Sequence, residues 1–269
     1  MADAFQDSSA LEIPSADLAS AAEFTDDAFL GGRVVMRQPA RGYRAGLDAV
    51  LLAAAAGSGG VALDVGAGVG TVGICFAARC PTASVVLVES EPGLVAYAEH
   101  NISSNGLSGR ARVVAADIAS ALTPSQAVVL PSAAFDIVLV NPPYHDHGSG
   151  KAPRNPLKAS AHAMAGHELD HWLRFAARMA APGGRAVVIH KAEALGRLLA
   201  AFNGRFGALR VLPILPRDSE PARRILITGI KGSRAPMTVL PGFVVHGVEG
   251  GYTPEAEAIL RHGAALDFG

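Results

Sequence analysis

The sequence predicts an α/β fold with a mostly parallel seven-stranded sheet, an antiparallel final strand and helices on both faces. Short apolar runs alternate with helix-length segments along the 269 residues, as in βαβ crossovers between parallel strands. The runs are apolar at consecutive positions, which is typical of strands covered on both faces. Half of the residues are hydrophobic, enough for one large core.

The apolar runs and the segments between them predict the elements in chain order. Parallel strands are expected at 61–65, 85–89, 111–115, 137–140 and 186–190, with helices near 70–79, 92–105, 166–181 and 193–205. Pro182-Gly183-Gly184 should end a helix and lead into the next strand. Runs 209–215 and 224–230 should pair antiparallel, because residues 216–221 are too few for a helical crossover.

Composition divides the chain into three parts. We expect an acidic flexible tail at residues 1–28, one main folded domain at 29–231, and a small extension packed on it at 232–269. The extension should contain a strand at 243–246 and a helix at 254–262. The first 32 residues hold seven acids and no Lys or Arg, so the remainder carries a formal charge of about +6 despite a net charge of −1. This is compatible with a polyanionic partner.

Cysteine content and hydropathy bear on the compartment. Cys75 and Cys80 are the two cysteines, too few for a disulfide framework, which favours the cytoplasm. We expect neither a secretory leader nor a membrane span, since the longest apolar run, 49–56, is far too short to cross a bilayer.

A glycine-rich turn follows the first predicted parallel strand. Asp64 lies within that strand, and Gly66-Ala67-Gly68 directly follow it, where glycines allow a ligand to approach the backbone and the next helix offers free N–H groups. Residues 68–73 also match the dinucleotide pattern G-x-G-x-x-G. That pattern should begin right after the strand, and counting from Gly66 places Thr71 where the third glycine belongs.

Polar residues end the next strands at the same edge. Glu89 can accept both hydroxyl hydrogens of a ribose, and Asp117 can accept from an adenine amino group. Asn141-Pro142-Pro143-Tyr144 follows the run at 135–140. Its prolines stop the strand and stiffen the turn, so an amide and an aromatic ring are held at the carboxyl edge of the sheet.

This set of residues resembles the class I S-adenosylmethionine-dependent methyltransferases of the Rossmann-like fold, specifically those with an N-P-P-Y motif that methylate planar nitrogens. Residues 38–52 resemble a segment of the bacterial valine-tRNA adenine-N6 methyltransferases. In that family the segment packs over the cofactor, which nominates Tyr43, Arg44 and Asp48 as cofactor neighbours. The other residues that the resemblance implies for cofactor binding are Asp64, Gly66, Ala67, Gly68, Glu89, Asp117 and Asn141.

The resemblance implies methyl transfer from S-adenosylmethionine to N6 of adenine in a structured RNA, with tRNA as the expected substrate. Asn141 and Pro142 would accept the hydrogens of the amine, and Tyr144 would stack on the base. Pro143, Tyr144, Lys151 and Arg154 are the expected substrate contacts. Two alternatives stay open: methylation of a glutamine amide in a peptide release factor, which poses the same chemical problem, and a non-catalytic protein that binds the cofactor.

One further motif suggests a different chemistry. His167-Glu168-Leu169-Asp170-His171 matches the H-E-x-x-H zinc pattern. We expect no metal there, because the segment opens a connecting helix whose Trp172 and Phe175 continue as a packing face. His190 is likewise expected to serve packing.

Overall fold

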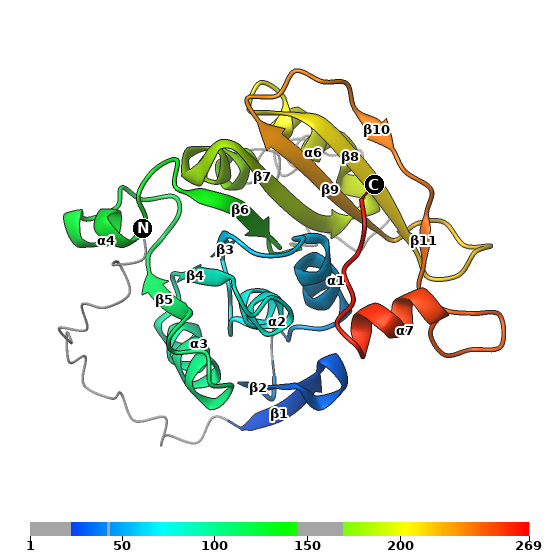
Figure 1. Ribbon diagram of the computed structural model, residues 1–269, viewed down its shortest axis with the longest axis horizontal. Helices are drawn as coiled ribbons and strands as arrows, with labels where there is room; N and C mark the ends of the chain where they lie inside the picture. The colour runs from blue at the N-terminus through cyan, green and yellow to red at the C-terminus, as the bar shows by residue number, and fades with distance from the viewer. Residues whose placement is uncertain (1–22, 42–43, 145–168, 269) are drawn as a thin grey trace, which may run out of the picture.

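The computed structural model describes residues 23–41, 44–144 and 169–268. Its central sheet has the order β10-β8-β9-β7-β6-β3-β4-β5, with β11 also paired to β8 (Figure 1). The strands are β3 Val61–Val65, β4 Ser84–Glu89, β5 Ala111–Ala115, β6 Phe135–Val140, β7 Ala180–Lys191, β8 Phe206–Leu215, β9 Arg224–Lys231, β10 Thr238–Val239 and β11 Phe243–Val244.

The predicted fold class is confirmed by the strand directions. Strands β5, β4, β3, β6 and β7 pair in parallel, and β9 lies between β7 and β8, antiparallel to both. The sheet is wider than the predicted seven strands because β10 and β11 each add a short parallel pairing to β8.

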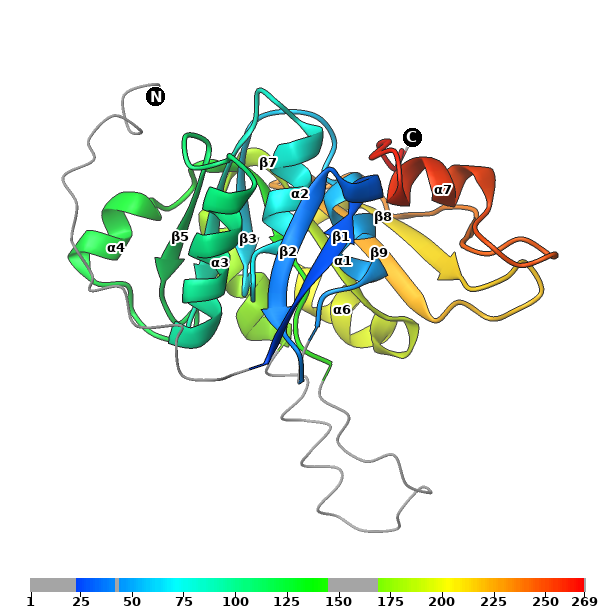
Figure 2. The same cartoon turned by 90° about the horizontal axis from the view of Figure 1, so that it is seen from below.

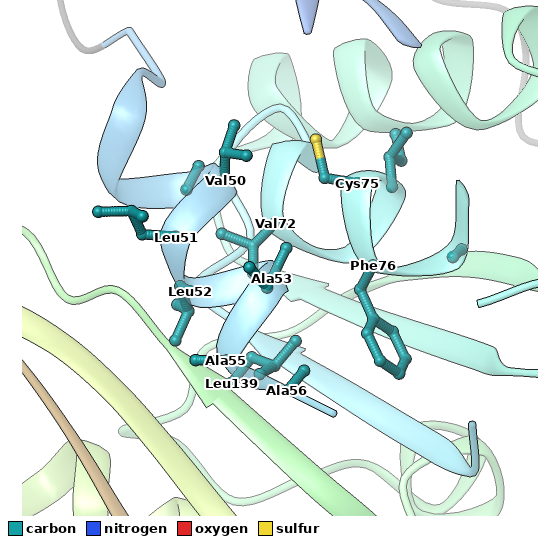
Figure 3. Packing of buried hydrophobic residues seen from close by; sticks show 14 of the residues in the cluster. Val50, Leu51, Leu52, Ala53, Ala55, Ala56, Val72, Cys75, Phe76 and Leu139 are labelled. Atoms are coloured by element: carbon teal, nitrogen blue, oxygen red, sulfur yellow. The ribbon is translucent and has the colours of Figure 1, made fainter. Parts of the chain in front are cut away.

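Helices cover both faces of the sheet, as predicted. One face is covered by α1 (Leu47–Ala55), α2 (Thr71–Arg79) and α3 (Pro92–Ser104). The other face is covered by helical residues 169–179 and by α6 (Leu195–Phe202). The turn η3 (Ala192–Ala194) directly precedes α6. Successive strand residues alternate between the two cores, so Ala62 belongs to the first and Leu63 to the second. Figure 3 shows α1 packed beside α2, with Ala53 next to Val72, and with Leu139 of β6 near Ala55 and Ala56.

A hairpin precedes the sheet and was not predicted. Strands β1 (Phe24–Phe29) and β2 (Val34–Pro39) pair antiparallel around the turn η2 (Leu30–Gly32), and the hairpin lies across the helices of the first face (Figure 2). The predicted boundary of the acidic tail at residue 28 is therefore too late, because residues 24–28 form a strand. Asp26 forms an ion pair with Arg37, and Asp27 forms one with Arg44.

Two side chains of the α3 region hold the hairpin to the domain. Asn101 accepts a hydrogen bond from the Arg37 N–H and donates to the carbonyls of Arg37 and Val69. Asn105 accepts from the Val35 N–H and donates to the Val35 carbonyl. The backbone of β2 is thus bonded by β1 on one side and by side-chain amides on the other.

Smaller differences concern the ends of elements. Strand β7 begins at Ala180, before Pro182-Gly183-Gly184 rather than after it, and its pairing with β6 shifts register across these residues. A short helix, α4 (Pro124–Val129), begins with a capping box formed by Thr123 and Gln126. In the C-terminal part, α7 covers Pro254–Leu260. Within the described ranges, no helix is long and apolar enough to cross a membrane.

Candidate active site

Four parallel strands bring the predicted polar residues to one edge. Val65 of β3 pairs with Val88 of β4 and with Val140 of β6, and Glu89 pairs with Ala115 of β5. The residues that follow each strand therefore meet at the carboxyl edge, where open α/β sheets bind ligands. A cavity of about 560 Å³ lies there, lined among others by Gly66, Gly68, Glu89, Asp117, Asn141 and Pro143.

Glu89 is the buried carboxylate of this cavity, with 8% of its surface exposed. One carboxylate oxygen accepts a hydrogen bond from the Gly68 N–H at 2.8 Å, and the other accepts from the N–H groups of Ser90 and Glu91. These bonds orient the carboxylate and tie the glycine-rich turn to the end of β4. Each oxygen of a carboxylate has about two lone-pair sites, so Glu89 can also accept from a ligand in the cavity.

Asp64 links β3 to the first turn of α2, on either side of the glycine-rich turn. It is buried, and its Oδ2 accepts a hydrogen bond from the Gly73 N–H in the first turn of α2 at 2.8 Å. Burial, reinforced by the charge of Glu89 and opposed by the Gly73 bond, raises the pKa of Asp64 to about 7. Neither Asp64 nor Ala67 is among the described residues that line the cavity, so their predicted contact with the cofactor stays a prediction.

Gly66 has a role that its position in the sequence did not reveal. Its φ is +64°, and a Cβ there would lie 2.2 Å from Cη2 of Trp172, far closer than van der Waals contact allows. Trp172 and His171 both line the cavity, although the sequence suggested only packing for Trp172. The sequence could not show this, because no local pattern places helix 169–179 against the glycine turn.

Asp117 lies on the exposed rim of the same cavity. Its carboxylate accepts hydrogen bonds from the Ala119 N–H and the Ser120 hydroxyl, and these two bonds hold the pKa of Asp117 below its usual range against a small opposing effect of burial. Asp117 is therefore an oriented, ionised acceptor beside apolar lining residues, which include Leu94 and Ile118.

A second cavity, of about 540 Å³, shares Asn141 with the first. Arg44, Asp48, Tyr144 and Arg224 line it. Arg44 and Asp48 therefore lie in the second cavity, whereas Pro143, expected to contact substrate, lines the first. Of the described residues that line the two cavities, Asn141 is common to both, at the position where a group bound in one cavity can meet a group bound in the other.

Tyr144 lies among charged and aromatic groups of the second cavity. Its hydroxyl is 3.0 Å from Asn141 Oδ1 and 3.1 Å from Asp48 Oδ2, and Asp48 Oδ2 accepts from Arg224 Nε at 2.7 Å. The guanidinium carbon of Arg224 lies 5.1 Å from the Tyr144 ring centroid. The expected stacking of a base on this ring stays a prediction. The sequence marks Arg224 as one of several basic residues of the C-terminal part, but no local pattern places it beside Tyr144.

Two pKa values describe the electrostatics around Tyr144. Burial lowers the pKa of Arg224, but the hydrogen bond and charge of Asp48 outweigh this, so its pKa lies above the ordinary value. His190 meets the Tyr144 ring edge-on with centroids 4.8 Å apart. Burial lowers the pKa of His190 to about 4, so its imidazole is neutral at physiological pH. Besides the packing role expected from the sequence, His190 thus contacts a side chain that is predicted to be catalytic.

Some predicted residues fall outside the described part of the chain, namely Tyr43, Lys151, Arg154, His167 and Glu168. Pro142 is described and buried, directly after Asn141. Among the residues that the structure describes, no group of three or more His, Cys, Asp and Glu side chains is arranged to hold a metal ion.

The fold and the first cavity define a class of protein. The volume lies in the range of small-molecule sites, and a buried acceptor at the end of β4, an acidic rim after β5 and an indole wall are groups that can bind a nucleoside. The methyltransferase small domain family matches residues 47–167. Fold, cavity and family match together identify an S-adenosylmethionine-dependent methyltransferase of class I.

Similarity to curated proteins identifies the family more closely. The chain is 30% identical over 256 residues to the tRNA1(Val) (adenine(37)-N6)-methyltransferase of Porphyromonas gingivalis, covering 85% of this chain and 91% of that protein. A protein of the same name from Shewanella loihica is 31% identical over 171 residues, covering 61% and 66%. The chain belongs to the tRNA1(Val) (adenine(37)-N6)-methyltransferase family.

Solved structures agree on the fold. The crystal structure of a predicted O-methyltransferase, protein Atu636 from Agrobacterium tumefaciens, has a TM-score of 0.68 and 29% identity, covering 81% of this chain and 98% of that one. The structure of Pyrococcus horikoshii TYW2 in complex with MeSAdo has a TM-score of 0.50 at 12% identity, covering 79% and 73%, and supports the fold alone.

Proposed function

We propose that this protein transfers a methyl group from S-adenosylmethionine to N6 of an adenine in tRNA, the adenine at position 37 of tRNA1(Val) being the candidate that the names of its relatives supply. The observation that carries the proposal is the position of Asn141 between two cavities. One cavity fits the nucleoside of the cofactor, and the other is open to a second planar group. A tRNA substrate also favours a cytoplasmic location.

The chemistry requires alignment more than a strong base. Bound S-adenosylmethionine supplies an electrophilic methyl group, whereas the lone pair of an exocyclic amine is delocalised into the adenine ring. Asn141 Oδ1 and the Pro142 carbonyl are suited to accept the two amine hydrogens. Fixing both hydrogens favours an amine geometry in which the lone pair points away from the ring and towards the methyl group.

Charges around the second cavity suit a polyanionic substrate. Arg44, Arg223 and Arg224 line it, and Arg217 lies close enough to Arg223 for both to pair with Glu220. Within the described residues, these four arginines form ion pairs with three acids, namely Asp27, Asp48 and Glu220. An excess of guanidinium groups beside the methylation site is suited to the phosphates that flank a nucleotide.

The release-factor alternative is not favoured, because the relatives that match most of this chain are named for adenine in tRNA. A protein that only binds the cofactor would not need an amide side chain that lines both cavities, as Asn141 does.

The test separates substrate from cofactor. Protein is incubated with labelled S-adenosylmethionine and, separately, tRNA, rRNA and release factors, and the modified nucleoside or residue is identified by mass spectrometry. We expect label on N6 of adenine in tRNA. Label on a glutamine amide, or binding of the cofactor without label on any pool, would overturn the proposal.

Replacement of Asn141 tests whether its side chain, which lines both cavities, takes part in methyl transfer. Asn141→Ala should keep the affinity for S-adenosylmethionine within a fewfold and lower kcat by roughly a hundredfold or more, the scale seen when one fixed polar group at a reacting centre is removed. Calorimetry and single-turnover methylation measure the two quantities. Asn203→Ala, at an exposed site after α6, is the matched control. Near-normal turnover of Asn141→Ala would refute the role of Asn141.

A further inference from the structure

The hydroxyl of Tyr144 is within hydrogen-bond distance of the Asn141 amide oxygen, the acceptor that the proposed reaction needs. It lies 3.0 Å from Asn141 Oδ1, the atom expected to accept a hydrogen from the substrate amine. A phenol has a single O–H proton. While that proton is directed at Asn141, the amide oxygen shares its lone pairs between the protein and the incoming amine, and its pull on the amine hydrogen is weakened.

Asp48 offers the same proton a second acceptor. Its Oδ2 is 3.1 Å from the Tyr144 hydroxyl, so rotation about the C–O bond can transfer the hydrogen bond from one acceptor to the other without moving the ring. A carboxylate is the stronger acceptor, because hydrogen bonds to ionised groups are roughly twice as strong as neutral ones. Asp48 lies in the first turn of α1, where the helix dipole also stabilises a negative charge.

Arg224 keeps the Asp48 side chain in place. Its Nε donates to the same Oδ2 at 2.7 Å, and about a third of the arginine side chain and a fifth of the aspartate side chain are exposed. The guanidinium group also lies over the Tyr144 ring. The three side chains come from α1, the turn after β6 and the start of β9, so the arrangement depends on the assembled fold and leaves no local signal in the sequence.

We propose that Asp48 is a positioning residue that draws the Tyr144 hydroxyl away from Asn141, so that one donor fewer competes with the substrate nitrogen for the Asn141 amide oxygen. The inference rests on the proposed function and adds to it, since the resemblance to relatives suggested Asp48 only as a neighbour of the cofactor. Arg224 holds Asp48 for this task. An alternative is that Asp48 and Arg224 form a purely structural ion pair.

Paired variants distinguish the two roles. Without Asp48, the Tyr144 proton has Asn141 as its remaining acceptor of the two, so Asp48→Ala should lower kcat about tenfold while the dissociation constant of S-adenosylmethionine stays within twofold. Tyr144→Phe keeps the ring and removes the hydroxyl. In the Tyr144→Phe background, Asp48→Ala should therefore change kcat less than twofold. Glu249→Ala, at an exposed acid, is the control for loss of a carboxylate.

An additive result would overturn the inference, because a structural ion pair would cost the same in both backgrounds. Asp48→Asn keeps the volume of the side chain and is assayed in the same way; we expect a smaller loss that Tyr144→Phe also removes. A readout independent of turnover is the side-chain NH₂ resonance of Asn141 in ¹⁵N-labelled protein. It should shift on Asp48→Ala and be insensitive to that change when Tyr144→Phe is also present.

Failure of the proposed function gives a different pattern. If the wild-type protein methylates no adenine, the function is wrong whatever the variants do. If it methylates adenine and the variant effects are additive, only the role of Asp48 is refuted.

Discussion

Replacing Asp64 with Asn should make the protein more stable at alkaline pH. Asp64 is buried and bonded to the Gly73 N–H, and burial near Glu89 raises its pKa to about 7 from an ordinary value of 3.8. Asn has the same shape and keeps an acceptor for Gly73. The substitution therefore removes an expensive buried charge while the bond that ties β3 to α2 is kept.

The sign and size of the effect follow from the two pKa values. Because the pKa is higher in the folded state, the folded protein binds more protons between pH 3.8 and about 7, and the free energy of unfolding falls as pH rises through this window. At about 1.4 kcal/mol per pKa unit, the full cost above pH 7 is on the order of 4 kcal/mol. Asp64→Asn should remove most of it.

Urea unfolding of both proteins at pH 5, 6, 7 and 8 measures the difference. The stability advantage of Asp64→Asn should be largest at pH 8 and shrink towards pH 5. Asp136→Asn is the control, because Asp136 is an exposed carboxylate that also accepts a backbone hydrogen bond, from Val61. The reasoning from burial would be refuted if Asp64→Asn were less stable than wild type at pH 8. It would also be refuted if the difference in free energy of unfolding between the two proteins were the same at every pH.

Two further predictions concern the glycine turn and the hairpin. Gly66→Ala should weaken binding of S-adenosylmethionine at least tenfold by calorimetry, because the new methyl group displaces Trp172. Gly106→Ala is its control, with a similar φ of +68° and no atom within 4 Å of its Cβ, and equal effects of the two would contradict the argument. Asn101→Ala should lower the free energy of unfolding by about 2–4 kcal/mol, since it leaves buried backbone groups without their partners. The same change at Asn105, whose bonds to Val35 are exposed, should cost under about 1 kcal/mol in the same urea experiment.

The parallel core of the fold was predictable because its strands carry their own signal. Strands such as β6 are apolar at nearly every position and are followed by turn residues, so their positions along the chain and their carboxyl ends could be predicted from local sequence. The positions of Glu89, Asp117 and Asn141 at one edge followed from that reading, and all three lie on the wall of one cavity.

The hairpin and the second cavity could not be predicted in this way. Strand β1 alternates exposed and half-buried residues in an acidic segment, and its partner β2 is held by amides that lie over sixty residues away. Likewise, Asp48 and Arg224 are 176 residues apart. Such contacts depend on the assembled tertiary structure, whereas a reading of short windows detects only neighbours in the chain.

The bonds from Asn101 and Asn105 also have a consequence for self-association. A two-stranded ribbon has two open edges, and an open edge can recruit a strand from another molecule. On the outer side of β2, the amide side chains already engage the N–H and carbonyl groups of Val35 and Arg37. The helix thus protects this edge against intermolecular strand addition, so loss of both asparagines should increase aggregation through β2 relative to the wild-type protein.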